Sequence, residues 1–233
     1  MDKIADGLLW YLAFIFSTTL HEASHAFAAY RLGDDTAYEG GQVTLDPIPH
    51  IRREPIGTIV VPIISFLLAG WMIVWASTPY NLEWAYNYPR RSAKMSLAGP
   101  AANLLLVLIT ALIIRIGISF GVFDAPEMIN FTHAVISTQG GVHSIVAAFL
   151  DVFFSLNLLL FLFNLLPIPP LDGSGIVPLF ISEERAVKYM EMIHNPSYSM
   201  MGLIVAWNIF DYIYAPFHLA AINILYLGVA HYG

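Results

Sequence analysis

The sequence predicts an all-α polytopic membrane protein with about four to six transmembrane or re-entrant helical segments. Hydrophobic residues make up 58% of the 233 positions and charged residues only 12%, whereas an ordinary globular domain carries about 25% charged residues. Several apolar runs reach the roughly 20 residues that a helix needs to cross a bilayer. We therefore expect a single integral-membrane domain over residues 1–233, surrounded by the lipid bilayer.

The first apolar segment, residues 7–30, contains His21, Glu22 and His25. Residues four apart share a helix face, so both imidazoles project to one side with Glu22 beside them. Two neutral imidazoles next to a carboxylate that is not a ligand are typical of a catalytic zinc site. The alternative interpretation is a pair of ordinary core histidines. It has less support inside a membrane helix, because ionisable groups there are costly and usually functional. At 1.5 Å per residue, the pair lies about 10 Å below the polar end of the segment.

A polar stretch follows, and its residues 42–46 alternate polar and apolar side chains. Two glycines precede these residues and permit a turn, whereas Pro47 and Pro49 stop a hydrogen-bond ladder. The pattern predicts a short β-hairpin or edge strand near residues 40–48, with the strand itself from Gln42 to Asp46.

The second apolar segment, residues 56–76, has basic residues on both sides. Arg52 and Arg53 precede it, and Arg90 and Arg91 follow it. Cytoplasmic loops carry an excess of Lys and Arg, so both flanks are expected on the cytoplasmic side and the segment is expected to re-enter. Its length alone would also permit a complete crossing, which stays the alternative.

Three further apolar segments cover residues 94–120, 144–166 and 199–230. The loop between the first two of them contains no Lys or Arg, whereas Arg185 and Lys188 follow residue 172. This bias predicts that the 7–30 segment runs inward, the 94–120 segment outward and the 144–166 segment inward. His21, His25 and Asp172 then lie towards the same cytoplasmic side. Whether residues 199–230 form one helix or two is left open by the sequence.

The third metal ligand must be His, Asp or Glu, because the chain contains no cysteine. The other histidines are expected in loops, at the carboxyl terminus or near helix ends. Asp172 follows a proline-rich break and precedes Gly173, which permits a sharp turn. Such a break can direct a carboxylate back towards a metal in the bilayer. The alternative is that Asp172 caps a helix at the membrane surface.

Three motifs, HEASH, SLAGPAANLLL and NLLPIPPLDG, resemble those of the site-2 protease family of intramembrane zinc metalloproteases. The resemblance covers most of the chain and is closest to compact bacterial members without a PDZ or CBS domain. It implies one zinc ion per chain, with His21, His25 and Asp172 as ligands and Glu22 as the general base. It also implies a bacterial inner-membrane location, and it places Asn164 near the substrate backbone. The alternative for Asn164 is a helix–helix hydrogen bond.

By this resemblance, the substrate is a transmembrane protein that is cut within or next to its membrane span. A helical substrate must be extended locally, and the predicted strand with Val43 and Thr44 is expected to hold it by strand addition. Two other functions stay open, a divalent-metal transporter and a proteolytically silent membrane scaffold. The presence of Glu22 argues against the scaffold. The net charge of −7 argues against nucleic acid as a partner, and the oligomeric state is left open.

Overall fold

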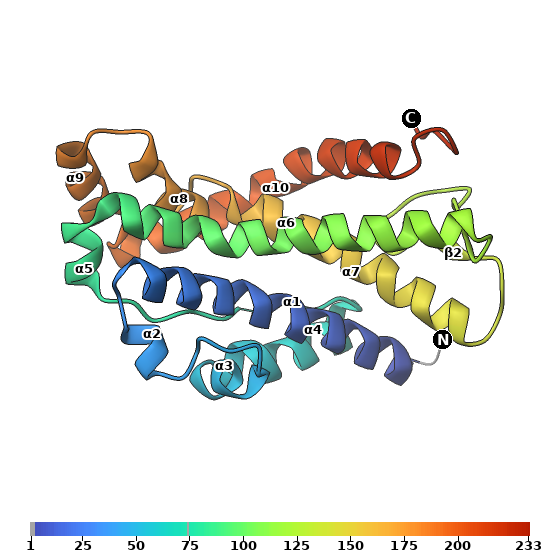
Figure 1. Ribbon diagram of the computed structural model, residues 1–233, viewed down its shortest axis with the longest axis horizontal. Helices are drawn as coiled ribbons and strands as arrows, with labels where there is room; N and C mark the ends of the chain where they lie inside the picture. The colour runs from blue at the N-terminus through green and yellow to red at the C-terminus, as the bar shows by residue number, and fades with distance from the viewer. Residues whose placement is uncertain (1–2, 74) are drawn as a thin grey trace.

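The structure is a computed structural model that describes residues 3–73 and 75–233 as a bundle of long helices (Figure 1). In this part of the chain four helices are long and apolar enough to cross a membrane: α1 (Lys3–Leu32), α6 (Pro89–Ser119), α7 (Val142–Asn164) and α10 (Pro196–Leu225). The prediction of an all-α polytopic membrane protein is confirmed. The last apolar segment is one helix, which contains Pro216.

The long helix α6 lies along the middle of the bundle and contacts both α1 and α7 (Figure 1). Arg91 donates a hydrogen bond from Nη1 to the carbonyl of Leu32 at 3.1 Å, so α6 begins beside the end of α1. Arg115 donates from Nη1 to the carbonyl of Leu225 at 3.2 Å, so α6 ends beside the end of α10. Successive long helices therefore run in opposite directions, and the carboxyl ends of α1 and α7 share one end of the bundle.

Small side chains let α1 and α6 approach closely. Ala26 and Ala29 of α1 and Ala93 of α6 are completely buried, and Gly99 of α6 also faces α1. Without a hydrophobic driving force between helices in lipid, such close backbone packing is a main source of helix association. The α1–α6 contact is the one that carries the two histidines.

A short loop structure closes the far end of the bundle, where α1 begins and α10 ends (Figure 1). Its two strands, β1 (Phe123–Asp124) and β2 (Ile136–Ser137), pair antiparallel. Ala134 attaches the loop to the helices, because its amide donates to Asp151 Oδ1 at 2.5 Å and its carbonyl accepts from the Tyr226 hydroxyl at 2.6 Å. This loop is the one without Lys or Arg.

The expected edge strand between Gln42 and Asp46 is wrong, because residues 43–45 form bends. The segment after the short helix α2 (Thr36–Glu39) leads into α3 (Pro47–Arg53). Asp46 Oδ1 accepts from the amide of Ile48 at 2.9 Å, and Pro47 is the first helical residue. An acidic N-cap followed by proline starts a helix, so the proline that seemed to end a strand in fact begins α3.

The apolar segment after α3 is a hairpin of one helical and one extended arm. The π-helical turn η1 (Ile56–Val60) and α4 (Val61–Ala69) form the first arm, and residues 71–73 and 75–81 return from Gly70. The amide of Trp75 donates to the carbonyl of Gly57 at 3.3 Å, and the hydroxyl of Ser77 donates to Glu54 Oε1 at 2.7 Å. The start and the end of the hairpin therefore lie side by side.

The length of the helical arm also argues for re-entry. At 1.5 Å per residue, η1 and α4 together rise only about 21 Å, which is less than the ~30 Å hydrocarbon core. The extended arm then brings the chain back to the level at which it entered, towards α5 (Leu82–Asn87) and the start of α6. We therefore keep the re-entrant interpretation of this hairpin as a prediction.

Membrane labelling tests that prediction directly, since the natural chain has no cysteine. We expect the single variants Arg52→Cys and Arg90→Cys, both at exposed positions, to react with a membrane-impermeant maleimide from the same side. Gln139→Cys, in the loop at the far end, is the control that should react from the other side. Reaction of positions 52 and 90 from opposite sides would show that the hairpin crosses the bilayer completely.

Candidate metal centre

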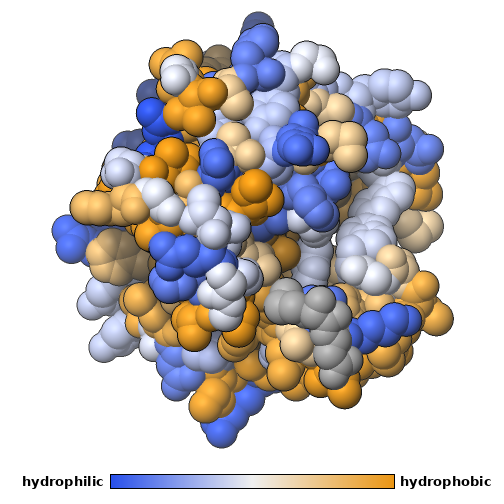
Figure 2. Space-filling view, turned by 90° about the vertical axis from the view of Figure 1, so that its right-hand side faces the viewer, coloured by the Kyte–Doolittle hydropathy of each residue, from blue (hydrophilic) through white to orange (hydrophobic). Residues whose placement is uncertain are grey.

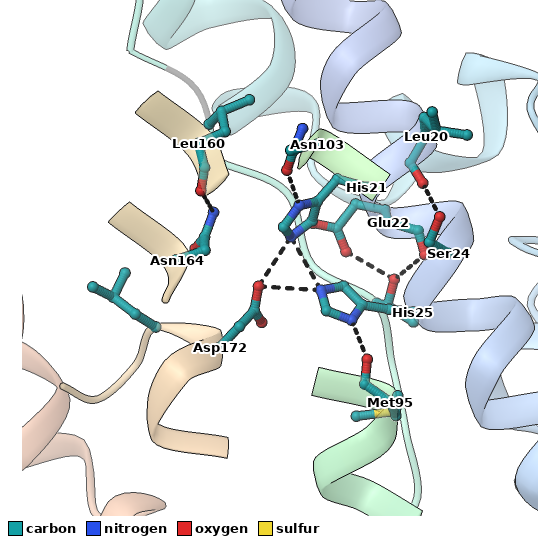
Figure 3. A network of polar contacts seen from close by, with 12 residues as sticks. Leu20, His21, Glu22, Ser24, His25, Met95, Asn103, Leu160, Asn164 and Asp172 are labelled. Carbon is teal, nitrogen blue, oxygen red and sulfur yellow. Dashed lines mark hydrogen bonds and ion pairs between the residues drawn. The ribbon is translucent and has the colours of Figure 1, made fainter. Parts of the chain in front are cut away.

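His21, His25 and Asp172 converge on one point between α1 and α8 (Asp172–Ile176), as Figure 3 shows. Asp172 Oδ2 lies 3.1 Å from His21 Nε2 and 3.3 Å from His25 Nε2, and the two Nε2 atoms are 3.0 Å apart. The histidines are 7% and 6% exposed. These three residues form a group that can bind a metal ion, and the sequence had pointed to each of them.

The hydrogen bonds of the two rings fix which nitrogens carry protons. His21 Nδ1 lies 2.6 Å from Asn103 Oδ1, and His25 Nδ1 lies 2.7 Å from the carbonyl oxygen of Met95. Both partners are carbonyl oxygens, which only accept, so each Nδ1 donates and each Nε2 presents a lone pair. Asp172 Oδ2 receives no hydrogen bond within the described residues and is buried. Three lone pairs therefore face one another, and a cation between them is the group that fits.

The side chain of Asn103 is itself held in place by a buried chain of hydrogen bonds. Its Nδ2 donates to Asn157 Oδ1 at 2.9 Å, and Asn157 Nδ2 donates to Ser17 Oγ at 2.9 Å. Asn103, Asn157 and Ser17 are completely buried. These bonds orient the Asn103 carbonyl oxygen towards His21, and such outer partners set the orientation and basicity of a metal-binding imidazole.

One face of α6 supplies the support for both histidines. Met95, Gly99 and Asn103 are four residues apart and so share this face. A Cβ at Gly99 would overlap His25 Nε2 and lie 2.6 Å from His21 Nε2. Because α1 and α6 run in opposite directions, His25 meets Met95 and His21 meets Asn103. The small residues around Gly99 predict a close helix contact, but the roles of Met95 and Asn103 were not predicted, although a polar Asn four residues after a Gly in a membrane span was the signal for them.

Close backbone packing fixes the position of Asp172. After α7 ends at Asn164, residues 165–171 form a series of turns, and Leu171 is extended where α8 begins. A Cβ at Gly173 would overlap the carbonyl oxygens of Leu165 and Leu166, so only glycine lets α8 pack against these turns.

Glu22 lies beside the ligand group and is bound by the extended arm of the hairpin. The hydroxyl of Thr78 is 2.8 Å from Glu22 Oε2 and 2.9 Å from the Glu22 backbone carbonyl. Glu22, Thr78, His25 and Asp172 line one pocket of about 330 Å³. Thr78 was not identified from the sequence, because nothing local indicates that residue 78 returns to residue 22.

The residues expected to contact a substrate are placed differently from the metal ligands. Asn164 is the last residue of α7, and its Nδ2 donates to the carbonyl of Leu160 at 3.1 Å within the same helix (Figure 3). Val43 and Thr44 line another groove, together with residues of α1 and α6 such as Leu20 and Ala98. A substrate contact of Asn164, Val43 or Thr44 stays a prediction.

Comparisons with known proteins point to one family. The family model described as peptidase family M50 matches residues 9–207. The protein named "Putative zinc metalloprotease YwhC" from Bacillus subtilis is 38% identical over 167 residues, which cover 71% of this chain and 66% of that protein. "Putative zinc metalloprotease Rip2" from Mycolicibacterium smegmatis is 31% identical over 170 residues, which cover 73% of this chain and 56% of that protein.

The Rip2 protein of Mycobacterium tuberculosis is 32% identical over 161 residues, which cover 68% of this chain and 52% of the relative. The chain thus spans about half to two thirds of the length of these relatives. No solved structure is a significant match.

Replacing Gly99 by alanine should abolish metal binding, because the added Cβ would occupy the space of His25 Nε2. We expect the metal content of purified Gly99→Ala protein, measured by atomic absorption, to fall from about one equivalent to near zero. Gly140→Ala is the matched control, since a Cβ there meets open space. Full metal content in Gly99→Ala would contradict this arrangement of α1 and α6.

Replacing Asn103 by leucine should weaken metal binding without removing a ligand. The loss of the acceptor for His21 Nδ1 is expected to lower zinc affinity by about 10- to 100-fold, as measured by competition with a chromogenic chelator. Asn103→Asp keeps an acceptor oxygen and should retain most of the affinity. Equal affinities in the leucine and aspartate variants would show that this bond does not orient the ring.

Proposed function

The chain belongs to peptidase family M50, and from this premise we propose that it is an intramembrane zinc metalloprotease. It hydrolyses peptide bonds within or next to the transmembrane segments of other membrane proteins. The observation that carries this proposal is the buried convergence of two imidazole nitrogens and one carboxylate oxygen beside Glu22. Two His and one acidic ligand leave a coordination position open, as a catalytic zinc site requires.

One zinc ion per chain, bound by His21, His25 and Asp172, would supply a Lewis acid for the attacking water and for the peptide carbonyl. Glu22 accepts the proton of that water on its carboxylate and passes it to the leaving amine nitrogen. The Thr78 hydroxyl lies next to Oε2 of Glu22, so it holds the carboxylate beside the ligand group and leaves Oε1 without a bond from Thr78.

The extended arm of the hairpin is the element that suits an unwound substrate. Ala76, Ser77, Thr78 and Tyr80 line the pocket beside Glu22. Within the described residues, none of their backbone amides has a hydrogen-bond acceptor. A stretched transmembrane segment can pair with such an edge by strand addition. We therefore assign to residues 76–80 the role that the sequence suggested for residues 42–46.

The location follows from the charge distribution and the relatives. Six of the ten Lys and Arg residues lie at the end of α1, in the first turns of α6 or in α9, at the end of the bundle that holds the carboxyl ends of α1 and α7: Arg31, Arg90, Arg91, Lys94, Arg185 and Lys188. This bias favours a cytoplasmic position for that end and for the metal centre. The relatives are bacterial proteins, which favours a bacterial inner membrane, with its lipids and a transmembrane protein substrate as partners.

The alternative functions receive less support. A divalent-metal transporter needs a polar path across the bilayer, but the polar side chains that are linked by hydrogen bonds to His21 belong to Asn103, Asn157 and Ser17. These groups are completely buried and bonded to one another. A proteolytically silent scaffold has no use for Glu22, which a dedicated hydroxyl holds beside the ligands.

Replacing Glu22 by glutamine should separate metal binding from turnover. We expect Glu22→Gln to keep its zinc and its fold but to cleave at least about 10²-fold more slowly, because the proton acceptor is gone. The assay uses a panel of single-span membrane proteins in detergent micelles, with products identified by mass spectrometry. Glu83→Gln, at an exposed position in α5, is the matched control. Unchanged cleavage by zinc-loaded Glu22→Gln would refute the mechanism.

A further inference from the structure

The side chains of two residues that line the catalytic pocket have no role in the mechanism above. Tyr80 lies on the extended arm of the hairpin, and His194 follows the amphipathic helix α9 (Glu183–Ile193). The Tyr80 hydroxyl and His194 Nε2 are 2.7 Å apart. Both residues line the pocket that also contains Glu22 and Asp172. The pair therefore joins two distant segments at the wall of the metal site.

The other hydrogen bond of His194 shows which member of this pair donates and which accepts. His194 Nδ1 lies 2.6 Å from the carbonyl oxygen of Met190, which only accepts, so Nδ1 carries the proton of the neutral ring. Nε2 is then an acceptor, and the Tyr80 hydroxyl donates to it. The lone pairs of the Tyr80 oxygen stay available to a donor in the pocket. Burial raises the pKa of Tyr80, which keeps the hydroxyl protonated and preserves this polarity.

The rings on either side hold the hydroxyl in place. Tyr80 packs against a buried cluster that includes Met95 and Met190. The ring of Tyr86 stands edge-on to His194, with centroids 5.7 Å apart. The carbonyls of the same two methionines accept hydrogen bonds from His25 and His194. The cluster that holds the Tyr80 ring therefore includes Met95, the residue that also orients His25.

We propose that the Tyr80 oxygen binds the substrate by accepting a hydrogen bond from one backbone N–H of the extended segment, with His194 as the positioning residue. The proposal rests on the proposed function and specifies how its substrate is held. A transmembrane helix that is unwound loses the acceptors of its amides, and an unpaired amide in a water-poor site costs several kcal/mol. Tyr80 is two residues beyond Thr78, which contacts the general base, so the amide that it binds lies close to the scissile bond.

An amide-to-ester scan tests the proposal. A model transmembrane peptide is prepared as a series in which one backbone N–H at a time, near the cleavage site, is replaced by an ester oxygen. For the wild type we expect kcat/KM to fall by about tenfold for each lost hydrogen bond, at the amides paired with residues 76–80 and at the one amide that the Tyr80 oxygen binds. Tyr80→Phe should show a similar loss with the all-amide peptide and no further loss with the ester at that position.

Two other variants separate binding from general damage. Tyr86→Phe keeps the ring beside His194 and should leave the scan unchanged. His194→Phe removes the acceptor that orients the Tyr80 hydroxyl. It should therefore reduce the loss of kcat/KM that the ester causes at the same position. The same scan, read as peptide binding by fluorescence anisotropy in a Glu22→Gln background, should give the same Tyr80-dependent position without any turnover.

The outcomes are distinguishable from a failure of the proposed function. If the wild type cleaves no peptide of the series and no membrane protein, the proteolytic function itself is wrong. If the wild type cleaves but Tyr80→Phe lowers every peptide by one common factor, or changes none, the tyrosine is structural and the inference is overturned. If Tyr80→Phe does not fold, an unchanged scan in His194→Phe overturns the inference instead.

Discussion

The convergence of three lone pairs in a buried space is the constraint on which the rest of the structure depends. Each of the two Nε2 atoms and the Asp172 oxygen would repel the others unless a cation lies between them. Holding them together therefore requires rigid support from outside. Part of this support comes from carbonyl oxygens that accept a hydrogen bond from each Nδ1. The rest comes from backbone packing at Gly173, which leaves Asp172 little freedom.

The antiparallel contact between α1 and α6 supplies most of this support. Histidines four residues apart on α1 face three positions four residues apart on α6, and the missing side chain at Gly99 makes room for the ligands. On the other side of α1, the extended arm of the hairpin brings Thr78 to Glu22. The two histidines thus rest on a long helix, whereas Glu22 is bound by a segment in which the amides of Ala76, Ser77, Thr78 and Tyr80 have no acceptor among the described residues.

Much of the fold and of the metal site could be predicted from the sequence, because the signals are local. Apolar runs gave the four long helices, and the spacing of His21 and His25 and the proline break before Asp172 gave the ligands. The predicted strand at residues 42–46 failed because three alternating residues are a weak signal, whereas Asp46 followed by Pro47 is a helix start. Asn103 and Thr78 were missed because their roles exist only through tertiary contacts.

The order of the ligands along the chain bears on how the protein is made. The histidines leave the ribosome first on α1, whereas Asp172 follows two further membrane spans, α6 and α7, which run in opposite directions. The three ligands cannot meet until both spans have been inserted with the correct orientation. Until then the group of His21, His25 and Asp172 is incomplete, and a misoriented copy never completes it. Correct membrane insertion and assembly of this group therefore become a single event.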